Sequence, residues 1–249
     1  MLIKSDRHTA SDLRLWDDLL EQDVLHGKTS KYKRHVEITQ SMISQFIEKN
    51  RDYYLAVSWG KDSVVMAHIF HKLGAKCKYV YFSNTNKTTE GCFAVRDAFL
   101  DRFAIDYEEH LYNYANADVN DSTFFGKDGK HVKWFAIQKM LKAKYGCHVT
   151  GVRFDESNKR KLRFVSYGAE TKNSFAPFRY MDVYDIFAYL AEHDLPTHPN
   201  YAMLGGGRWD KYRIRVAMIG HKEGDGIGRA EWEREYYPDV LNRLQAKRG

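Results

Sequence analysis

The chain has 249 residues, of which 43% are hydrophobic, and a formal net charge of +6. This length and composition suit one large folded domain and exclude wholesale disorder. No apolar run approaches the ~18 residues of a membrane-spanning helix, and the first residues lack the apolar core of a secretory signal. We therefore expect a cytoplasmic protein without membrane contact. Its positive charge favours anionic ligands such as nucleotides, phosphate, sulfate or nucleic acid.

Two amphipathic helices are predicted at residues 9–25 and 35–49, where apolar side chains recur with helical spacing. A link rich in lysine and arginine, residues 27–34, separates them. We expect residues 1–50 to form a helical N-terminal extension that packs on the main body.

Residues 51–200 alternate short apolar runs with helical patterns. Strands are predicted at residues 53–57, 78–82, 105–109 and 147–152, and a further strand at 162–167. Helices are predicted from Val64 to Gly74 and at residues 90–103, 131–145 and 182–193, the last of them capped by Asp182. This order predicts an α/β fold, in which a parallel twisted sheet carries helices on both faces and forms a nucleotide-binding domain.

The pattern is looser in residues 201–249, which contain a glycine triplet at 205–207 and a basic, strand-like stretch at 213–216. The final helix is interrupted by Pro238. We interpret this segment as an irregular C-terminal substrate or lid region that packs on the same domain.

The cysteines and two isolated histidines do not indicate a metal site or a catalytic site by themselves. The three cysteines, Cys77, Cys92 and Cys147, lie far apart and form no C-x-x-C pair, which argues against a disulfide framework, a zinc site and an iron–sulfur cluster. We interpret them as small, partly buried apolar residues. His198 and His221 stand alone and are interpreted as polar surface residues.

The sequence S-W-G-K-D-S at residues 58–63 lies between the first predicted strand and the helix that follows it. A loop in this position presents backbone N–H groups, and the helix N-terminus adds positive potential. Gly60 permits close approach of an anion, and Lys61 supplies a positive charge. Asp62 is placed to hold a loop N–H or a magnesium ion. The motif therefore predicts a pyrophosphate site, although it is not a Walker-type loop, because no G-x-x-x-x-G-K-[S/T] pattern is present.

The same six residues resemble the pyrophosphate loop (PP-loop) of the adenine nucleotide α-hydrolase superfamily, whose usual form is S-G-G-x-D-S. Trp59 replaces the first glycine of that form. Later segments resemble the phosphoadenosine phosphosulfate (PAPS) reductase-like family within this superfamily. They are Y-F-S-N-T-N-K-T-T-E at residues 81–90, G-V-R-F-D-E-S-N-K-R at 151–160, and D-V-Y-D-I-F-A-Y-L with the following L-P at 182–196.

The resemblance implies that the chain binds ATP, or PAPS or its analogue APS, together with Mg²⁺. The residues it implies for catalysis are Lys61, Arg153, Glu156 and Arg160. Those it implies for nucleotide binding are Val57, Ser58, Trp59, Gly60, Lys61, Asp62, Ser63, Phe82, Asn84, Thr85 and Arg153, with Asp62 as the metal ligand.

Four basic residues follow the glycine triplet, namely Arg208, Lys211, Arg213 and Arg215. If Arg213 and Arg215 lie on a strand, they face the same side. One interpretation is a basic loop that closes over a second, anionic substrate. The other, about equally supported, is a solvent-facing edge strand that carries charge.

The position of the cysteines separates the functions that the resemblance allows. PAPS reductases carry a C-terminal catalytic cysteine, whereas this sequence has none after Cys147, so we do not expect thiol-dependent reduction. The leading hypothesis is an enzyme that cleaves ATP between the α- and β-phosphates, adenylates an oxyanion and releases pyrophosphate, as a sulfate adenylyltransferase does.

Two alternatives stay open. One is sulfurtransferase-type modification of tRNA or DNA, and the other is a regulatory protein that binds PAPS or an adenine nucleotide without turnover. The expected partners are an adenine nucleotide and an anionic small-molecule substrate. The sequence leaves open whether a protein subunit also binds, and nucleic acid is not favoured.

Overall fold

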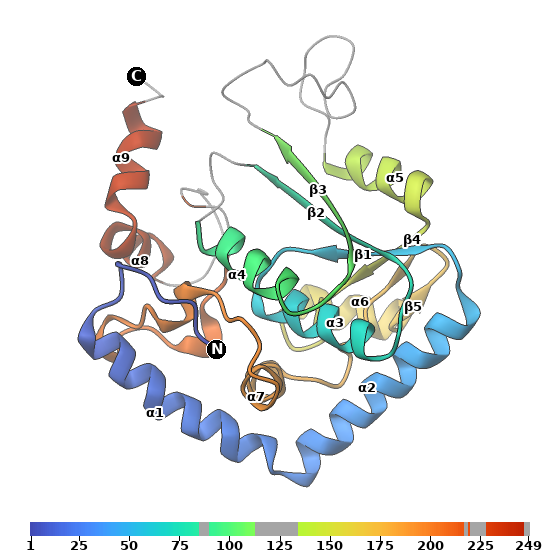
Figure 1. Cartoon of the computed structure of the whole chain (residues 1–249), viewed down its shortest axis with the longest axis horizontal. Coiled ribbons are helices and arrows are strands. Elements are labelled where there is room, and N and C mark those ends of the chain that lie inside the picture. The colour runs from blue at the N-terminus through green and yellow to red at the C-terminus, as the bar shows by residue number, and fades with distance from the viewer. Residues whose placement is uncertain (85–89, 113–133, 217–218, 220–227, 247–249) are drawn as a thin grey trace.

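The computed structural model describes residues 1–84, 90–112, 134–216, 219 and 228–246 (Figure 1). Within these residues one sheet contains the strands β1 (Tyr53–Val57), β2 (Lys78–Asn84), β3 (Asp106–Tyr112), β4 (Cys147–Thr150), β5 (Glu170–Thr171) and β6 (Ser174–Phe175). Their order is β3-β2-β1-β4-β6-β5. Neighbouring strands are parallel except for β5 and β6. The predicted α/β fold with a largely parallel sheet is confirmed.

Helices cover both faces of this sheet because successive side chains of a strand point to opposite sides. Leu55 and Val57 of β1 belong to the large core that includes α3 (Lys61–Lys72). Tyr54 packs instead with Leu141 of α5 (Trp134–Tyr145) on the opposite face. The remaining helices of this region are α4 (Glu90–Leu100), α6 (Asn158–Tyr167) and α7 (Val183–Glu192).

The N-terminal extension consists of α1 (Ala10–Gly27) and α2 (Ser30–Lys49), which run along one side of the molecule (Figure 1). The link between them is shorter than predicted, because Thr29 already caps α2 by accepting a hydrogen bond from Tyr32. The extension packs on α7, where both carboxylate oxygens of Asp185 pair with histidines. Asp185 lies 2.7 Å from His26 of α1 and 2.7 Å from His35 of α2.

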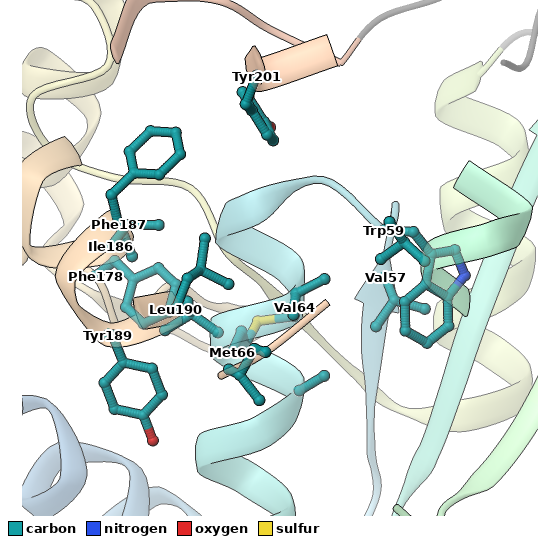
Figure 2. Packing of buried hydrophobic residues seen from close by; sticks show 14 of the residues in the cluster. Val57, Trp59, Val64, Met66, Phe178, Ile186, Phe187, Tyr189, Leu190 and Tyr201 are labelled. Carbon is teal, nitrogen blue, oxygen red and sulfur yellow. The ribbon is translucent and has the colours of Figure 1, made fainter. Parts of the chain in front are cut away.

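The largest core lies between α3 and α7. Figure 2 shows Val64 and Met66 of α3 between Ile186, Phe187 and Leu190 of α7 on one side and Val57 and Trp59 on the other. All of these side chains are at most 4% exposed. Burial of this size fixes α3, whose first turn carries the predicted pyrophosphate loop.

The C-terminal region contains short 3-10 helices η1 (Pro199–Ala202), η2 (Gly205–Gly207) and η3 (Lys211–Arg213), followed by α8 (Arg229–Tyr236) and α9 (Pro238–Ala246). The break at Pro238 is confirmed. Asp12 of α1 accepts hydrogen bonds at 3.0 Å from the backbone N–H of Leu204 and from the hydroxyl of Tyr236, so α1 and the C-terminal region pack together. None of the helices that the structure describes has the length and apolar character required to span a membrane.

Three local predictions were wrong. Residues 162–167 belong to helix α6, because Ser157 caps its first turn. Residues 213–216 do not form a strand, since η3 ends at Arg213 after its cap by Asp210. His198 is 1% exposed rather than at the surface, where its Nδ1 caps η1 by accepting from Asn200. His221 lies outside the described residues.

Candidate functional site

The pyrophosphate loop connects the carboxyl end of β1 to α3, and Gly60 is the N-cap residue of that helix. The hydroxyl of Ser63 closes the loop. It accepts from the backbone N–H of Ser58 at 3.1 Å and donates to the carbonyl of Gly60 at 3.0 Å. Ser63 is therefore engaged by the loop itself, and the hydroxyl of the exposed Ser58 also donates to it at 3.3 Å. In an open α/β sheet, this end of the strands is where ligands bind.

Trp59 adopts the left-handed conformation, with φ at +58°. This conformation costs a non-glycine residue about 1–2 kcal/mol, which accounts for the glycine in the usual motif. The indole ring is fully buried and contacts Tyr81, Phe99 and Tyr107, with ring centroids 6.5, 5.5 and 5.6 Å away. The ring therefore points into the core behind the loop, and only the Trp59 backbone remains for a ligand on the other side.

Lys61, Asp62 and Arg153 form a buried ion network beside the loop. The Lys61 ammonium lies 3.1 Å from one carboxylate oxygen of Asp62, and Arg153 donates a hydrogen bond to the other oxygen. Burial lowers the pKa of Lys61, and Asp62 opposes this shift. Burial also disfavours the Asp62 carboxylate, but Lys61 and Arg153 together outweigh that effect and lower its pKa. The Asp62 carboxylate and the Arg153 guanidinium are therefore charged near neutral pH, whereas burial works against the charge on Lys61.

Asp155, not Glu156, orients the Arg153 guanidinium, because its carboxylate accepts from Arg153 Nε at 2.9 Å. Burial opposes the charge on Arg153, but Asp62 and Asp155 raise its pKa. Both oxygens of Asp62 are engaged by cations in this arrangement. The described residues therefore do not fit a magnesium ion at Asp62, contrary to the prediction.

Tyr201 of η1 contacts the same loop from the C-terminal region. Its hydroxyl accepts a hydrogen bond from the backbone N–H of Lys61 at 3.2 Å, and its ring lies below the Lys61 ammonium at 5.3 Å. Figure 2 shows the Tyr201 ring above the start of α3. Nothing in the sequence distinguishes this tyrosine from the other sixteen among the chain's 17.

A cavity of about 600 Å³ extends from the loop along one face of the sheet. Predicted site residues that line it are Val57, Ser58, Asp62, Ser63, Phe82, Glu156 and Arg160. Further lining residues come from α5 and from the strands, among them Lys142, Tyr54 and His148. Lys61 and Arg153 do not line the cavity themselves, but both contact Asp62, which does. A second cavity of about 500 Å³ lies at the amino ends of the strands, near Cys77. None of the predicted site residues lines it.

Gly151 brings the end of β4 against the first turn of α3. A side chain at this position would place its Cβ 3.0 Å from the carbonyl carbon and oxygen of Asp62. This close approach explains the glycine that begins the 151–160 segment. The segment then continues into α6, which carries Arg160 at the cavity wall.

The four basic C-terminal residues do not form one surface. The Lys211 side chain is fully buried, paired with Asp23 of α1 and lying 4.5 Å from the centre of the Trp16 ring. It is therefore unavailable to a substrate here, contrary to the prediction. Arg208 pairs with Glu235 at the surface. Arg213 is exposed in η3.

Arg215 is the one of these four that reaches the cavity rim, where its Nη2 donates to the backbone carbonyl of Glu156 at 3.1 Å. Among the other predicted residues, Asn84 ends β2, and Thr85 lies outside the described residues. Phe82 lies at the cavity from the neighbouring strand.

Comparison with protein families identifies the chain's class. Residues 52–203 match the phosphoadenosine phosphosulfate reductase domain, which covers more than half of the chain. The chain therefore belongs to the family of that domain, within the PP-loop superfamily that the sequence resembles. A search of curated proteins found no matching sequence.

Comparison with solved structures finds similar chains at low sequence identity. Phosphoadenylyl-sulfate (PAPS) reductase from Candida auris, in a phosphate complex, superposes with a TM-score of 0.50 at 14% identity, covering 77% of this chain and 94% of that one. NMN synthetase from Francisella tularensis gives 0.48 at 12% identity, covering 88% and 96%. The U34-tRNA thiolase NcsA from Methanococcus maripaludis, with its 4Fe-4S cluster, gives 0.45 at 12% identity, covering 86% and 77%.

Proposed function

We propose that the chain binds an adenine nucleotide with its pyrophosphate at residues 58–63 and cleaves ATP between the α- and β-phosphates. An oxyanion acceptor would be adenylated, and pyrophosphate would leave. The observation that carries this proposal is the opening of the loop, at the N-terminus of α3, into a cavity of about 600 Å³. That volume is typical of small-molecule sites.

The barrier to this reaction is mainly the charge that builds on the α-phosphoryl group and on the departing pyrophosphate. In the proposed complex, the first turn of α3 and Lys61 stabilise the pyrophosphate. Arg160 contacts the phosphoryl group or the acceptor from the cavity wall, and the Glu156 carboxylate, 4.0 Å from Arg160 Nε, orients it. Arg153 acts as a positioning residue, because it holds Asp62 against Lys61.

The test is isothermal titration with ATP, combined with ATP–pyrophosphate exchange in the presence of sulfate. Lys61→Ala should raise the Kd for ATP more than tenfold and abolish exchange. Lys72→Ala is the matched control, because Lys72 is exposed in the last turn of the same helix. Failure of the wild-type chain to bind ATP, or equal effects of the two variants, would contradict the proposal.

A second candidate is a protein that binds the nucleotide without turnover. One observation favours it: both Asp62 oxygens are engaged by Lys61 and Arg153. Pyrophosphate exchange separates the two candidate functions. Nucleotide binding without pyrophosphate exchange, across sulfate and other oxyanion acceptors, would support the second.

A further inference from the structure

Helix α6 exposes most of its apolar side chains. Leu162 is 67% exposed, Val165 71% and Tyr167 69%, whereas Phe164 is the one buried residue among the ten of this helix. A short helix in a folded protein is stabilised mainly by packing an apolar face against its neighbours, and α6 buries a single side chain in this way. Exposed apolar side chains that lie together mark a surface to which another molecule binds. The outer side of α6 is therefore a candidate docking surface.

This surface combines two aliphatic side chains with two lysines. Leu162 and Val165 are three residues apart and so lie on one face of the helix. At about 100° per residue, Leu162 lies about 160° around the helix axis from Phe164, so this face points away from the core. The same projection places Lys161 on one flank of the aliphatic pair and Lys159 on the other, and both lysines are exposed. We refer to Lys159, Lys161, Leu162 and Val165 as the basic face of α6.

Helix α1 carries a surface of opposite charge. Its buried side chains, among them Trp16 and Asp23, face the rest of the molecule. On the outer side, Val24 is 44% exposed and Leu25 61%. Three exposed carboxylates precede them within about two turns, and none of the three forms an ion pair within the described part of the chain. We refer to Asp17, Asp18, Glu21, Val24 and Leu25 as the acidic face of α1.

The two faces complement each other in charge and in apolar character. Four of the ten residues of α6 are basic and none is acidic. Among the residues that the structure describes, Arg160 is the one of these four that lies near a carboxylate, 4.0 Å from that of Glu156. Both faces are exposed, so they do not meet within one molecule. Contact between two molecules would pair their charges around the aliphatic side chains, which is the usual arrangement of a polar rim around an apolar centre.

We propose that the basic face of α6 binds the acidic face of α1 in a second copy of this chain. Leu162 and Val165 then pack against Val24 and Leu25 of the other copy, and the charged side chains surround this contact. Because the two faces belong to different helices, a two-fold dimer contains the contact twice, whereas a head-to-tail assembly contains it once per neighbouring pair. Helix α1 lies outside residues 52–203, so the interface is not a property of the matched domain alone.

Other occupants fit the basic face of α6 less well. Helix α6 of a second copy would bring like charges together. A nucleic acid would neutralise the lysines, but Leu162 and Val165 offer its bases no aromatic ring for stacking. An anionic lipid surface would be held by few apolar groups, since even a single myristoyl chain binds membranes only marginally. The acidic face of α1 supplies both carboxylates and aliphatic side chains.

Sedimentation velocity of the full chain, over a range of protein concentrations, measures this association. Two short helix faces bury less area than the ~1,600 Å² of a standard interface, so the contact should be weak. We therefore expect a reversible rise in mass above that of one chain at micromolar concentrations. Added NaCl should weaken the association, because salt screens the charged side chains around the contact.

Two double variants remove the two faces separately. Lys161→Glu with Leu162→Gln changes α6, and Glu21→Lys with Leu25→Gln changes α1. All four side chains are exposed, so both variants should keep the wild-type melting temperature. Each variant alone should raise the dissociation constant at least tenfold. An equimolar mixture should associate more tightly than either variant alone, since each retains the face that the other lacks.

Lys33→Glu and Glu37→Lys are the matched controls, because they make the same charge changes at exposed positions of α2, outside both faces. Neither should alter the association. The proposal is overturned if the wild-type chain stays monomeric, if a control weakens association as much as the matched double variant, or if the mixture stays monomeric.

A wild-type chain that stays monomeric and binds duplex DNA or anionic vesicles, in a way that the α6 variant loses, would assign the basic face to that occupant instead. None of these measurements involves a nucleotide, so their outcome is independent of the proposed function.

Discussion

The backbone N–H of Lys61 donates to the hydroxyl of Tyr201, 140 residues later in the chain. This hydrogen bond joins the first turn of α3 to η1. The hydroxyl thereby holds the first turn of α3, at whose N-terminus the proposed anion binds, in one orientation. Because Tyr201 is buried, its ring also limits the directions in which the Lys61 side chain can turn.

Tyr201→Phe should therefore weaken nucleotide binding as well as folding. The ring below Lys61 stays, but one buried N–H loses its acceptor, which costs about 1–3 kcal/mol. We expect the Kd for ATP to rise three- to tenfold by titration. Tyr79→Phe is the control, because its buried hydroxyl donates to Ala67 at 3.4 Å, away from the loop. Equal changes in Kd for the two variants would reject a role of Tyr201 in binding.

Gly60 and Gly151 should respond differently to alanine. At Gly60 φ is −80°, and a Cβ would lie no closer than 3.5 Å to another residue, so Gly60→Ala should keep the wild-type melting temperature. It should still raise the Kd for ATP at least tenfold, because the methyl group stands where the phosphate approaches. Gly151→Ala meets the Asp62 backbone at 3.0 Å and should lower the melting temperature. Wild-type affinity in Gly60→Ala would place the phosphate elsewhere.

Lys211 should matter for stability and not for substrate binding. Lys211→Met leaves Asp23, which is 2% exposed, without its cationic partner and with only the Tyr212 hydroxyl as a donor. The variant should destabilise the fold by about 3–5 kcal/mol in chemical denaturation. Adding Asp23→Asn should restore part of this loss. Arg213→Met, at an exposed position of η3, should leave stability unchanged. If Lys211→Met instead raised the Kd for sulfate and left the stability unchanged, the result would support a role of Lys211 in substrate binding.

His198 should make the fold sensitive to acid. Burial, with smaller effects of Arg229 and His8, lowers its pKa from 6.5 to about 3. Below about pH 6.5 the His198 imidazole binds a proton in the unfolded chain but not in the folded chain. Stability is therefore lost as the pH falls from about 6.5 toward 3. One such group costs about 1.4 kcal/mol per pH unit in this window. His198→Asn retains a capping side chain. In this variant the denaturation midpoint should fall less steeply with decreasing pH between pH 6.5 and 4.5. An unchanged dependence of the midpoint on pH would contradict this assignment.

The sequence predicts the centre of the sheet well because β1 is a short apolar run followed by turn and helix signals. It fails at α6, where Leu162 and Phe164 alternate with Lys161 and Arg163 as in a half-buried strand. Leu162 is in fact exposed, on a helix that buries only Phe164. The hydrogen bond that starts α6, from the Arg160 N–H to the Ser157 hydroxyl, is a local signal that the alternating pattern obscured.

In the candidate site, the proximity of residues within one motif, such as Lys61 and Asp62, could be predicted because loop and helix are adjacent in sequence. The contact of Tyr201 with the loop could not be predicted, since it depends on how distant elements pack. Lys211 was predicted to bind substrate because it lies in a basic run. Nothing in that run indicates that its side chain is buried and paired with Asp23.

The buried indole of Trp59 has a consequence for the energetics of ligand binding. A glycine at this position would let the loop sample many backbone conformations, whereas the indole, held by Phe99 and Tyr107, fixes one of them. The conformational entropy of the loop is then lost once, when the chain folds, and not again each time an anion binds. In the proposed complex, Trp59 therefore preorganises the loop for the pyrophosphate.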